Sequence, residues 1–281
     1  MIDANIFTIP PGTPFLATLV DALLSGELVG PLGPDELAAA TIYLPTRRAG
    51  RALAELLAER SRGRGLVLPR IVPLGDADEE SGTGGASASA DLKPAIPPLE
   101  RRLILTRLVQ AWAAQVDRTQ LRLAPDTPFM VPGSPADAVS LAGDLEGLMD
   151  ALATESVDWA ALEEVVEIDY SHYFRLTLDF VRIAHDLWPG ILAERGAMDP
   201  AVRRNAVIDS ETRRLGAHPP SGPVIAAGST GSIPVTARLL ATIARLPRGA
   251  VVLPGLDLDL DETGWAAIAG DGQTGGVHGH P

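Results

Sequence analysis

The chain has 281 residues, of which 46% are hydrophobic, and it carries a formal net charge of −13 at pH 7. This length and composition exclude an intrinsically disordered protein and allow one large buried core or two smaller ones. The acidic balance argues against broad non-specific binding to nucleic acid, because phosphate backbones attract basic surfaces. Since cysteine is absent, these residues hold no disulfide, thiolate metal site or cysteine-bound iron–sulfur cluster.

The sequence has no segment that is typical of a membrane span or a secretion signal. No apolar run reaches about 18 residues, the length that a membrane-spanning helix needs. The first residues, Met1–Gly12, lack a basic segment followed by an apolar one. We therefore expect a cytoplasmic protein without a membrane partner.

Charge is distributed unevenly along the chain. Arginines cluster between Arg47 and Arg70, where the acidic residues are Glu55 and Glu59. From Leu123 to Phe174, by contrast, acidic residues are frequent and there is no lysine or arginine. The pattern fits two surfaces with different partners, and the acidic stretch also fits an ordinary solvated helical surface.

The N-terminal residues predict a strand, a loop and a helix. Asn5–Ile9 is β-rich, and Pro10–Pro14 forms a rigid loop. Phe15–Leu24 has helical periodicity and ends at Gly26, a typical helix terminator. A short helical segment over Asp35–Ala40 precedes the next strand.

A second strand–helix pair follows. Thr41–Leu44 predicts the strand and Arg47–Arg60 the helix, with Thr46 as a suitable N-cap. Leu66–Leu68 is a candidate third strand. The first turns of the helix hold arginines that we expect to be exposed at the carboxyl end of the second strand: Arg47, Arg48 and Arg51.

The middle of the chain predicts only helices. Residues 75–94 are rich in Gly, Ser, Ala and acidic residues and predict a low-complexity loop. The helices predicted after it are Pro98–Val116, Pro135–Ala153 with Ser134 as N-cap, Trp159–Glu167, His172–Glu194, and a helix that Asp199-Pro200 opens and Gly216 ends.

Strands resume near the C-terminal end. Val224–Ala227 is an apolar run of strand length, and a small polar turn, Gly228–Ser232, follows it. A helix is predicted from Pro234, with Ser232 as its N-cap, and Ala250–Leu253 is the next strand. Apolar strands joined through a helix predict a parallel sheet that is covered on both faces.

We therefore predict an α/β fold in which one parallel sheet is interrupted by an all-helical insertion. Residues 1–74 and 219–270 supply the sheet, and residues 95–218 form the insertion. Two independent domains would leave the N-terminal strands with too little cover. The polar, Gly-rich residues 271–281 predict a disordered tail.

The loop after the first strand lies where a nucleotide-binding α/β fold holds its phosphate loop. A Walker A loop needs backbone N–H groups and a lysine that reach the phosphates. Here the loop reads PPGTP, whose prolines have no N–H group, and the only lysine in the chain is Lys93 in the low-complexity segment. We do not expect this loop to support ATP hydrolysis.

Two other segments of the sequence are candidate binding sites. The turn formed by Gly228, Ser229, Thr230, Gly231 and Ser232 could bind an anion at a helix N-terminus, although many such turns hold no ligand. The alternating carboxylates after the last strand invite comparison with a Walker B acid, but Pro254-Gly255 separates them from the strand; they are Asp257, Asp259 and Asp261.

No catalytic or metal-binding pattern is apparent. The histidines His172, His185, His278 and His280 have neither zinc-ligand spacing nor a nucleophile context. The sequence therefore predicts no catalytic residue, no metal site and no cofactor in this chain.

Several segments, in order, resemble the N-terminal part of the AddB family, and more narrowly its alphaproteobacterial members. AddB is the B subunit of the AddAB helicase–nuclease of double-strand break repair. The segments are IFTIPPGTPFLATLVDALL, ATIYLPTRRAGRALAELL, LPRIVPLGD, AIPPLERRLILTRLV and PVIAAGSTGSIPVTARLLATIARLPRGAVVLPGLDLDLDE. They cover nearly the whole chain and contain no catalytic motif.

The resemblance implies a RecA-like domain similar to superfamily 1 helicases, with degenerate motifs and helical insertions. YLPTRRAGRAL then occupies the place of a motif that contacts single-stranded DNA in working helicases. The implied contacts to the DNA backbone are Thr46, Arg47, Arg48 and Arg51. The alternative is that these arginines pair with Glu55 or with the A subunit.

The resemblance also implies partners: an AddA-type helicase–nuclease subunit in a heterodimer, and DNA ends. The family's C-terminal nuclease domain uses Mg²⁺ and an iron–sulfur cluster, and nothing in this chain matches that domain, so the chain resembles a truncated or fragmentary product. Two functions remain open. One is an ATPase-inactive scaffold that guides DNA, and the other is a stand-alone α/β enzyme that binds a phosphorylated small molecule at Gly228–Ser232.

Overall fold

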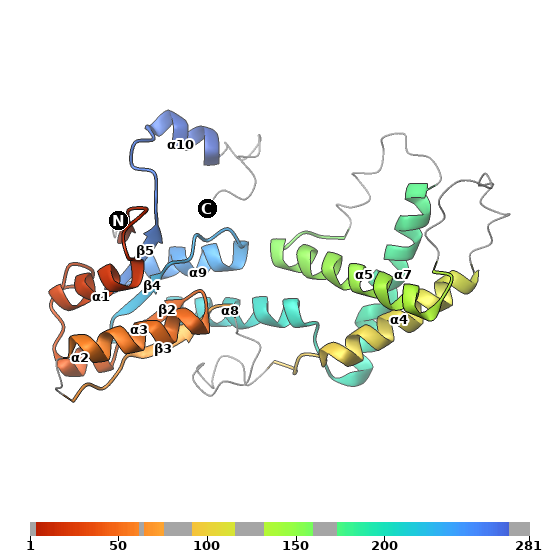
Figure 1. The fold of residues 1–281 in the computed structure, drawn as a ribbon, viewed down its shortest axis with the longest axis horizontal. Coiled ribbons are helices and arrows are strands. Elements are labelled where there is room, and N and C mark those ends of the chain that lie inside the picture. The colour runs from red at the N-terminus through yellow and green to blue at the C-terminus, as the bar shows by residue number, and fades with distance from the viewer. Residues whose placement is uncertain (1–3, 62–64, 76–91, 116–131, 160–172, 270–281) are drawn as a thin grey trace. The chain divides into compact units, whose positions relative to one another are not determined.

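The computed structural model describes residues 4–61, 65–75, 92–115, 132–159 and 173–269 (Figure 1). The predicted tail, most of the low-complexity loop and nearly all of the helix predicted at Trp159–Glu167 lie outside these residues. The chain divides into two compact units. Unit 1 combines Met1–Asp91 with Ala206–Pro281, and unit 2 is Leu92–Asn205.

Unit 1 is built on one five-stranded sheet in which every pair of neighbours is parallel. The strands lie in the order β1-β5-β4-β2-β3, so strands from both ends of the chain share the sheet. This confirms the predicted parallel α/β class. The bounds are β1 Ile6–Ile9, β2 Thr41–Leu44, β3 Arg70–Pro73, β4 Val224–Ala227 and β5 Gly249–Pro254.

The prediction of the third strand at Leu66–Leu68 was wrong, because β3 begins at Arg70. In the observed register Ile42 pairs with Ile71 and Tyr43 with Val72. Ile71 packs into the core on one face of the sheet and Val72 into the core on the other. The shift thus gives this edge strand one apolar side chain for each face, whereas Val67 remains 71% exposed.

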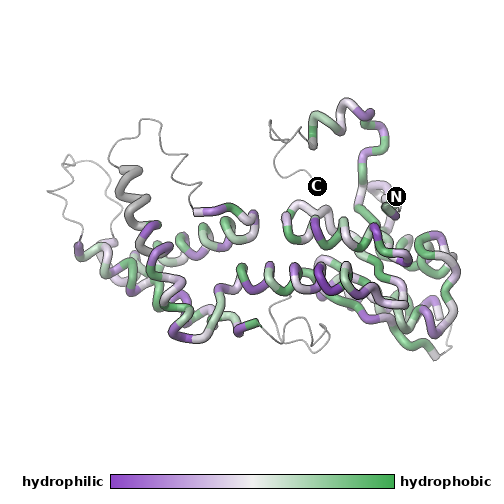
Figure 2. The backbone as a smooth tube through the Cα atoms, turned by 180° about the vertical axis from the view of Figure 1, so that it is seen from behind, coloured by the Kyte–Doolittle hydropathy of each residue, from purple (hydrophilic) through white to green (hydrophobic). Residues whose placement is uncertain are grey.

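Helices cover both faces of the sheet (Figure 1). On one face α1 (Phe15–Ser25), α2 (Pro34–Ala38) and α3 (Arg47–Arg60) pack on Ile42 and Ile225. On the other face α9 (Pro234–Ala244) and the end of α8 (Pro200–Ala217) pack on Val224 and Val251. Figure 2 shows hydrophobic residues along the strands and mixed helix surfaces, as two-sided burial requires.

The directions of the two crossover connections explain why helices lie on both faces of the sheet. The β2–α3–β3 unit moves across the sheet in one direction, and the β4–α9–β5 unit moves in the opposite direction. Crossovers of one hand must then place α3 and α9 on opposite faces. The chain therefore leaves the neighbouring strands β2 and β4 toward opposite faces, and this divergence is where open α/β sheets bind ligands.

Two of the predicted helix N-caps are present in the structure and a third is not. Thr46 caps α3 and Ser134 caps α5, each accepting a hydrogen bond from a backbone N–H three residues on. The cap predicted at Ser232 was wrong, since α9 begins after Ile233, which has no side-chain cap. Ile233 packs into the core beside α9, and this fixes the helix start one residue beyond Ser232.

Unit 2 contains only helices and one isolated parallel bridge, Ala95 to Met198, among its described residues. Its helices are α4 (Pro98–Gln115), α5 (Pro135–Glu155), α7 (Tyr173–Arg195) and the first part of α8. The core includes Leu105, Val109 and Leu145. The second part of α8 belongs to unit 1, because Ile208 and Leu215 pack against the sheet, whereas the predicted insertion extended to residue 218.

The remaining helix, α10 (Glu262–Ala269), follows β5 in unit 1. None of the described helices combines the length and the apolar composition that a membrane-spanning segment requires.

Candidate functional site

The N-terminus of α3 follows directly from β2 and is held rigidly. The hydroxyl oxygen of Thr46 accepts a hydrogen bond from the Ala49 N–H at 3.1 Å. A Cβ atom on Gly50 would lie 3.0 Å from the Ile71 side chain, so glycine lets α3 pack closely against β3. The cap and this close packing fix where the first turns of α3 project at the carboxyl edge of the sheet.

The arginines of this helix end differ in exposure. Arg48 and Arg51 are exposed as predicted, but the prediction was wrong for Arg47, which is partly buried with two of its guanidinium nitrogens inaccessible to solvent. The side chains of Arg48 and Arg51 form no hydrogen bond or ion pair with any residue that the structure describes, so the predicted alternative of pairing with Glu55 is not formed there. At the other end of α3, Arg60 pairs with Asp21 at 2.9 Å. The start of α3 therefore presents positive charge that anionic groups can reach.

The loop after β1 offers few donors to a phosphate. Pro10, Pro11 and Pro14 lack an N–H group, and the Thr13 N–H already donates to the Pro10 carbonyl at 3.3 Å. The loop also contacts its neighbour after β5, since a Cβ on Gly255 would lie 3.2 Å from the Pro11 ring. These contacts give the loop a packing role and leave it poorly suited to hold a triphosphate.

The predicted anion turn, Gly228–Ser232, is also shaped by packing. Gly228 and Gly231 both have positive φ angles, and a Cβ on Gly228 would lie 3.2 Å from the Phe15 ring. The Gly228 N–H donates to the Val252 carbonyl at 2.9 Å, and the Gly231 N–H to the Ser229 hydroxyl at 3.4 Å. Two of the five N–H groups of the turn are thus occupied, and those of Ser229, Thr230 and Ser232 have no hydrogen bond to the described residues.

The carboxylates after β5 shape turns. One oxygen of Asp257 accepts the Asp259 N–H at 2.9 Å, and one oxygen of Asp261 accepts the Gly264 N–H at 2.7 Å at the start of α10. No group of three metal-ligating side chains occurs within the described ranges. Of the histidines, His185 lies on the surface 3.0 Å from Asp186, and the other three considered above lie outside those ranges.

A buried polar cluster that the sequence did not predict joins α8 to the sheet. The hydroxyl group of Tyr43 in β2 donates a hydrogen bond to the Glu211 carboxylate. Glu211 also accepts two hydrogen bonds from Arg214, at 2.7 and 2.8 Å. Burial and the charge of Glu211 raise the pKa of Tyr43. Burial opposes the ionisation of Glu211, but hydrogen bonds from Arg214 and Tyr43 outweigh it and lower the pKa of Glu211. The cluster is a closed structural anchor rather than a reactive site.

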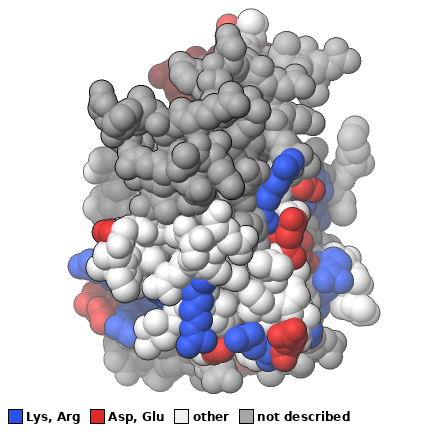
Figure 3. All heavy atoms as spheres, turned by 90° about the vertical axis from the view of Figure 1, so that its right-hand side faces the viewer, with Lys and Arg blue, Asp and Glu red and all other residues white. Residues whose placement is uncertain are grey.

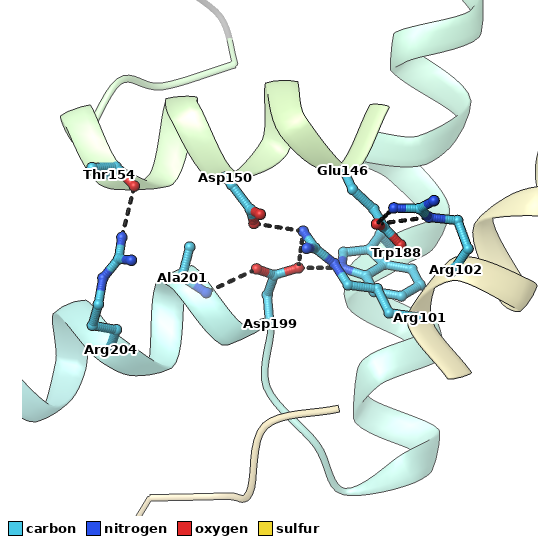
Figure 4. A network of polar contacts seen from close by, with 9 residues as sticks. All are labelled: Arg101, Arg102, Glu146, Asp150, Thr154, Trp188, Asp199, Ala201 and Arg204. Carbon is cyan, nitrogen blue, oxygen red and sulfur yellow. Dashed lines mark hydrogen bonds and ion pairs between the residues drawn. The ribbon is translucent and has the colours of Figure 1, made fainter. Parts of the chain in front are cut away.

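A second buried cluster holds unit 2 together (Figure 4). Arg101 of α4 is 4% exposed and lies 2.9 Å from both Asp150 of α5 and Asp199. Asp199 also accepts hydrogen bonds from the Trp188 indole at 3.1 Å and from the Ala201 N–H at 3.3 Å. Burial raises the pKa of Asp199, although Arg101 opposes that change.

These contacts revise the interpretation of the acidic stretch. Two of its carboxylates, Glu146 and Asp150, pair with Arg102 and Arg101 of α4. The Glu146 side chain is 12% exposed and is largely withdrawn from solvent, whereas that of Asp150 remains 47% exposed. Figure 3 shows one face on which the described basic and acidic side chains lie next to one another. The uneven charge of the sequence is thus partly neutralised by tertiary pairing.

No protein-family model matches this chain, and a search of curated proteins found no match.

We predict that Glu211→Ala lowers the free energy of unfolding by about 2 kcal/mol, because it removes the acceptor of the buried Tyr43 hydroxyl and of the partly buried Arg214 guanidinium. Tyr43→Phe should cost about 1 kcal/mol, since Glu211 keeps its Arg214 hydrogen bonds. Urea unfolding followed by circular dichroism measures both changes. Equal losses in the two variants would contradict the assignment.

The same cluster predicts a dependence on pH. Because the pKa of Glu211 is lowered on folding, its contribution to stability is complete above the unfolded value of about 4.3 and is lost as the pH falls toward the folded value. The stability difference between the wild type and Glu211→Gln should therefore shrink below about pH 4. A difference that is independent of pH would contradict this.

We predict that Arg101→Met destabilises unit 2 by roughly 3 kcal/mol, because it leaves buried carboxylate charge without a cation. Adding Asp199→Asn should recover part of this loss, since asparagine is neutral and still accepts hydrogen bonds. The fluorescence of Trp112 and Trp188, both buried in unit 2, reports the unfolding transition in urea. Strictly additive losses would argue against the coupling.

We predict that Gly228→Ala destabilises the protein more than Gly30→Ala does. Both glycines have left-handed backbones, with φ angles of 76° and 83°, so each alanine should cost roughly 1 kcal/mol in backbone strain. Only Gly228 would also bring its Cβ against Phe15, because nothing lies within 4 Å of a Cβ on Gly30. Thermal unfolding of both variants measures the difference.

Proposed function

We propose that this chain is a helicase-like, ATPase-inactive N-terminal region of an AddB-type helicase–nuclease subunit, which supports a partner helicase and guides DNA during double-strand break repair and recombination. The observation that carries the proposal is the start of α3, where Arg48 and Arg51 project beside the capped end of a helix at the carboxyl edge of a parallel sheet. Guanidinium groups in that position suit contact with a DNA backbone.

The architecture supports the proposal, although it does not identify the family. The parallel sheet takes strands from both ends of the chain, and the helices of unit 2 lie in the sequence between β3 and β4. A RecA-like domain with a helical insertion would have this organisation. Because parallel α/β sheets serve many functions, the proposal depends on the residues at the edge of the sheet.

The loop after β1 supports the ATPase-inactive part of the proposal. A phosphate loop needs several free N–H groups and a cation. Here prolines remove donors, Thr13 uses its own N–H within the loop, and Lys93 belongs to unit 2. The ATP-driven step of such a complex would then be performed by the partner subunit.

The alternative, a stand-alone enzyme that binds a phosphorylated small molecule at Gly228–Ser232, receives less support. Two N–H groups of the turn are occupied, and α9 begins with Pro234, which has none. The pocket that borders Thr230 is also lined by the carboxylate of Asp257, which would repel a phosphate. An anion at this turn would have to be bound by the N–H groups of Ser229, Thr230 and Ser232, beside a pocket that Asp257 also lines.

We predict that Arg48→Ala/Arg51→Ala weakens binding of the 281-residue chain to a fluorescein-labelled single-stranded oligonucleotide. The slope of log affinity against log salt concentration should fall by about 1.4, or about 0.7 for each lost phosphate contact. Fluorescence anisotropy at several salt concentrations measures both quantities. The matched control, Arg213→Ala/Arg245→Ala, removes the same charge from exposed arginines of α8 and the end of α9 and should change the slope less.

An equal fall of the slope in both double variants would show that net charge alone determines binding, and would overturn the assignment to α3. A thermal-shift series with ATP and a sugar phosphate addresses the alternative. Stabilisation by either compound without any response to DNA would favour the small-molecule enzyme.

A further inference from the structure

A pocket of about 150 Å³ opens at the carboxyl end of β5. It is lined by Leu253–Asp257 together with Thr230 and Trp265. Thr230 comes from the turn after β4, and Trp265 comes from α10. The pocket therefore lies entirely within unit 1, between the chain segments that follow two neighbouring strands.

Hydrogen bonds to β1 and its flank fix the wall of the pocket. The Gly255 N–H donates to the Ile9 carbonyl at 2.9 Å, and the Leu256 N–H donates to the Thr8 hydroxyl at 2.9 Å. Gly255 has a φ angle of 68°, which turns the chain away from the strand. At the other end, the Asp261 side chain accepts the Gly264 N–H and starts α10, which carries Trp265 back to the pocket.

The lining has a distinct chemistry. It combines aliphatic surface, one flat indole ring, one hydroxyl and one carboxylate, and it contains no arginine or lysine. One oxygen of Asp257 accepts the Asp259 N–H, and the other has no partner among the described residues. A pocket lined by both an indole and a carboxylate acceptor suits a heteroaromatic ring that carries N–H groups, and it does not suit a phosphate.

The pocket and the start of α3 lie at the same edge of the sheet. In a parallel sheet all carboxyl ends lie at one edge, so β5 and β2 both point toward it. Only β4 lies between them, which separates their ends by about 10 Å, or two strand spacings. A DNA strand whose phosphates contact Arg48 and Arg51 would thus pass close to the indole of Trp265.

We propose that this pocket binds one unstacked nucleobase of single-stranded DNA. The base stacks on Trp265, and Asp257 accepts a hydrogen bond from a ring N–H or an exocyclic amino group. The proposal rests on the proposed function for the source of its ligand, because a free nucleoside offers the same chemistry. Arginines at α3 then hold the backbone, while the pocket holds a base.

The test compares two labelled oligonucleotides of equal length, one of deoxycytidine and one of abasic residues, which has phosphates but no bases. Trp265→Ala should weaken binding of the deoxycytidine strand about tenfold and leave binding of the abasic strand unchanged. Trp265→Phe keeps an aromatic ring and should retain most of the affinity, which separates stacking from a general effect on folding.

Asp257→Ala, which removes both the negative charge and the hydrogen-bond acceptor, supplies a second test in which the two effects have opposite signs. Removing a negative charge near DNA strengthens binding if only charge matters. Loss of the carboxylate acceptor should instead weaken binding of the deoxycytidine strand and spare the abasic strand. Tighter binding of both strands by this variant would overturn the proposed base contact.

The outcomes separate this proposal from the proposed function. If Arg48→Ala/Arg51→Ala weakens both strands while Trp265→Ala and Asp257→Ala change neither, the base pocket is overturned and DNA contact at α3 stands. If no strand binds but titration with free cytidine gives a signal that Trp265→Ala abolishes, the pocket stands and the DNA function falls. If neither DNA nor cytidine binds, both are overturned.

Discussion

The pairing of β2 with β4 is the constraint on which the rest of unit 1 depends. Thr41, Ile42 and Tyr43 lie beside Val224, Ile225 and Ala226, so segments from the two ends of the sequence meet in the centre of the sheet. Side chains alternate between faces, with Ile42 and Ile225 in one core and Tyr43 and Ala226 in the other. Helices must therefore cover both faces, and all carboxyl-end loops gather at one edge.

The loops at that edge of the sheet differ in the chemical groups that they expose. The loop after β1 is rich in proline, and the turn after β4 uses two of its five N–H groups internally, so both offer a phosphate fewer donors than a phosphate loop does. Exposed guanidinium groups are found instead at the start of α3, and an indole beside a carboxylate is found after β5. Charge attraction and ring stacking are the two interactions that single-stranded nucleic acid offers without sequence recognition.

The net charge of the chain does not describe the charge at each part of its surface. A net charge of −13 would repel DNA if it were spread evenly. Some of the acidic side chains are occupied in pairs, Asp150 and Asp199 around Arg101 and Glu211 with Arg214. Because these carboxylates are paired within the fold, the exposed Arg48 and Arg51 of α3 can still present positive charge at the edge of the sheet.

The sequence by itself determined the elements and the class of the fold. Apolar runs located β2 and β4, helical periodicity located α3 with its Thr46 cap, and apolar strands alternating with helices implied a parallel sheet. These features are local, so a window of a few residues contains the information that specifies them. The exposure of Arg48 and Arg51 could be predicted for the same reason, whereas the partial burial of Arg47 could not.

Only the tertiary structure decided which distant residues meet. The register of β3 depends on packing against α3, and the start of α9 depends on where Ile233 is buried. The contacts of Tyr43 with Glu211 and of Arg101 with Asp199, like the pocket beside Trp265, join residues from separate elements. No local pattern specifies such contacts, because the free energy that fixes them comes from burial and pairing in the folded chain.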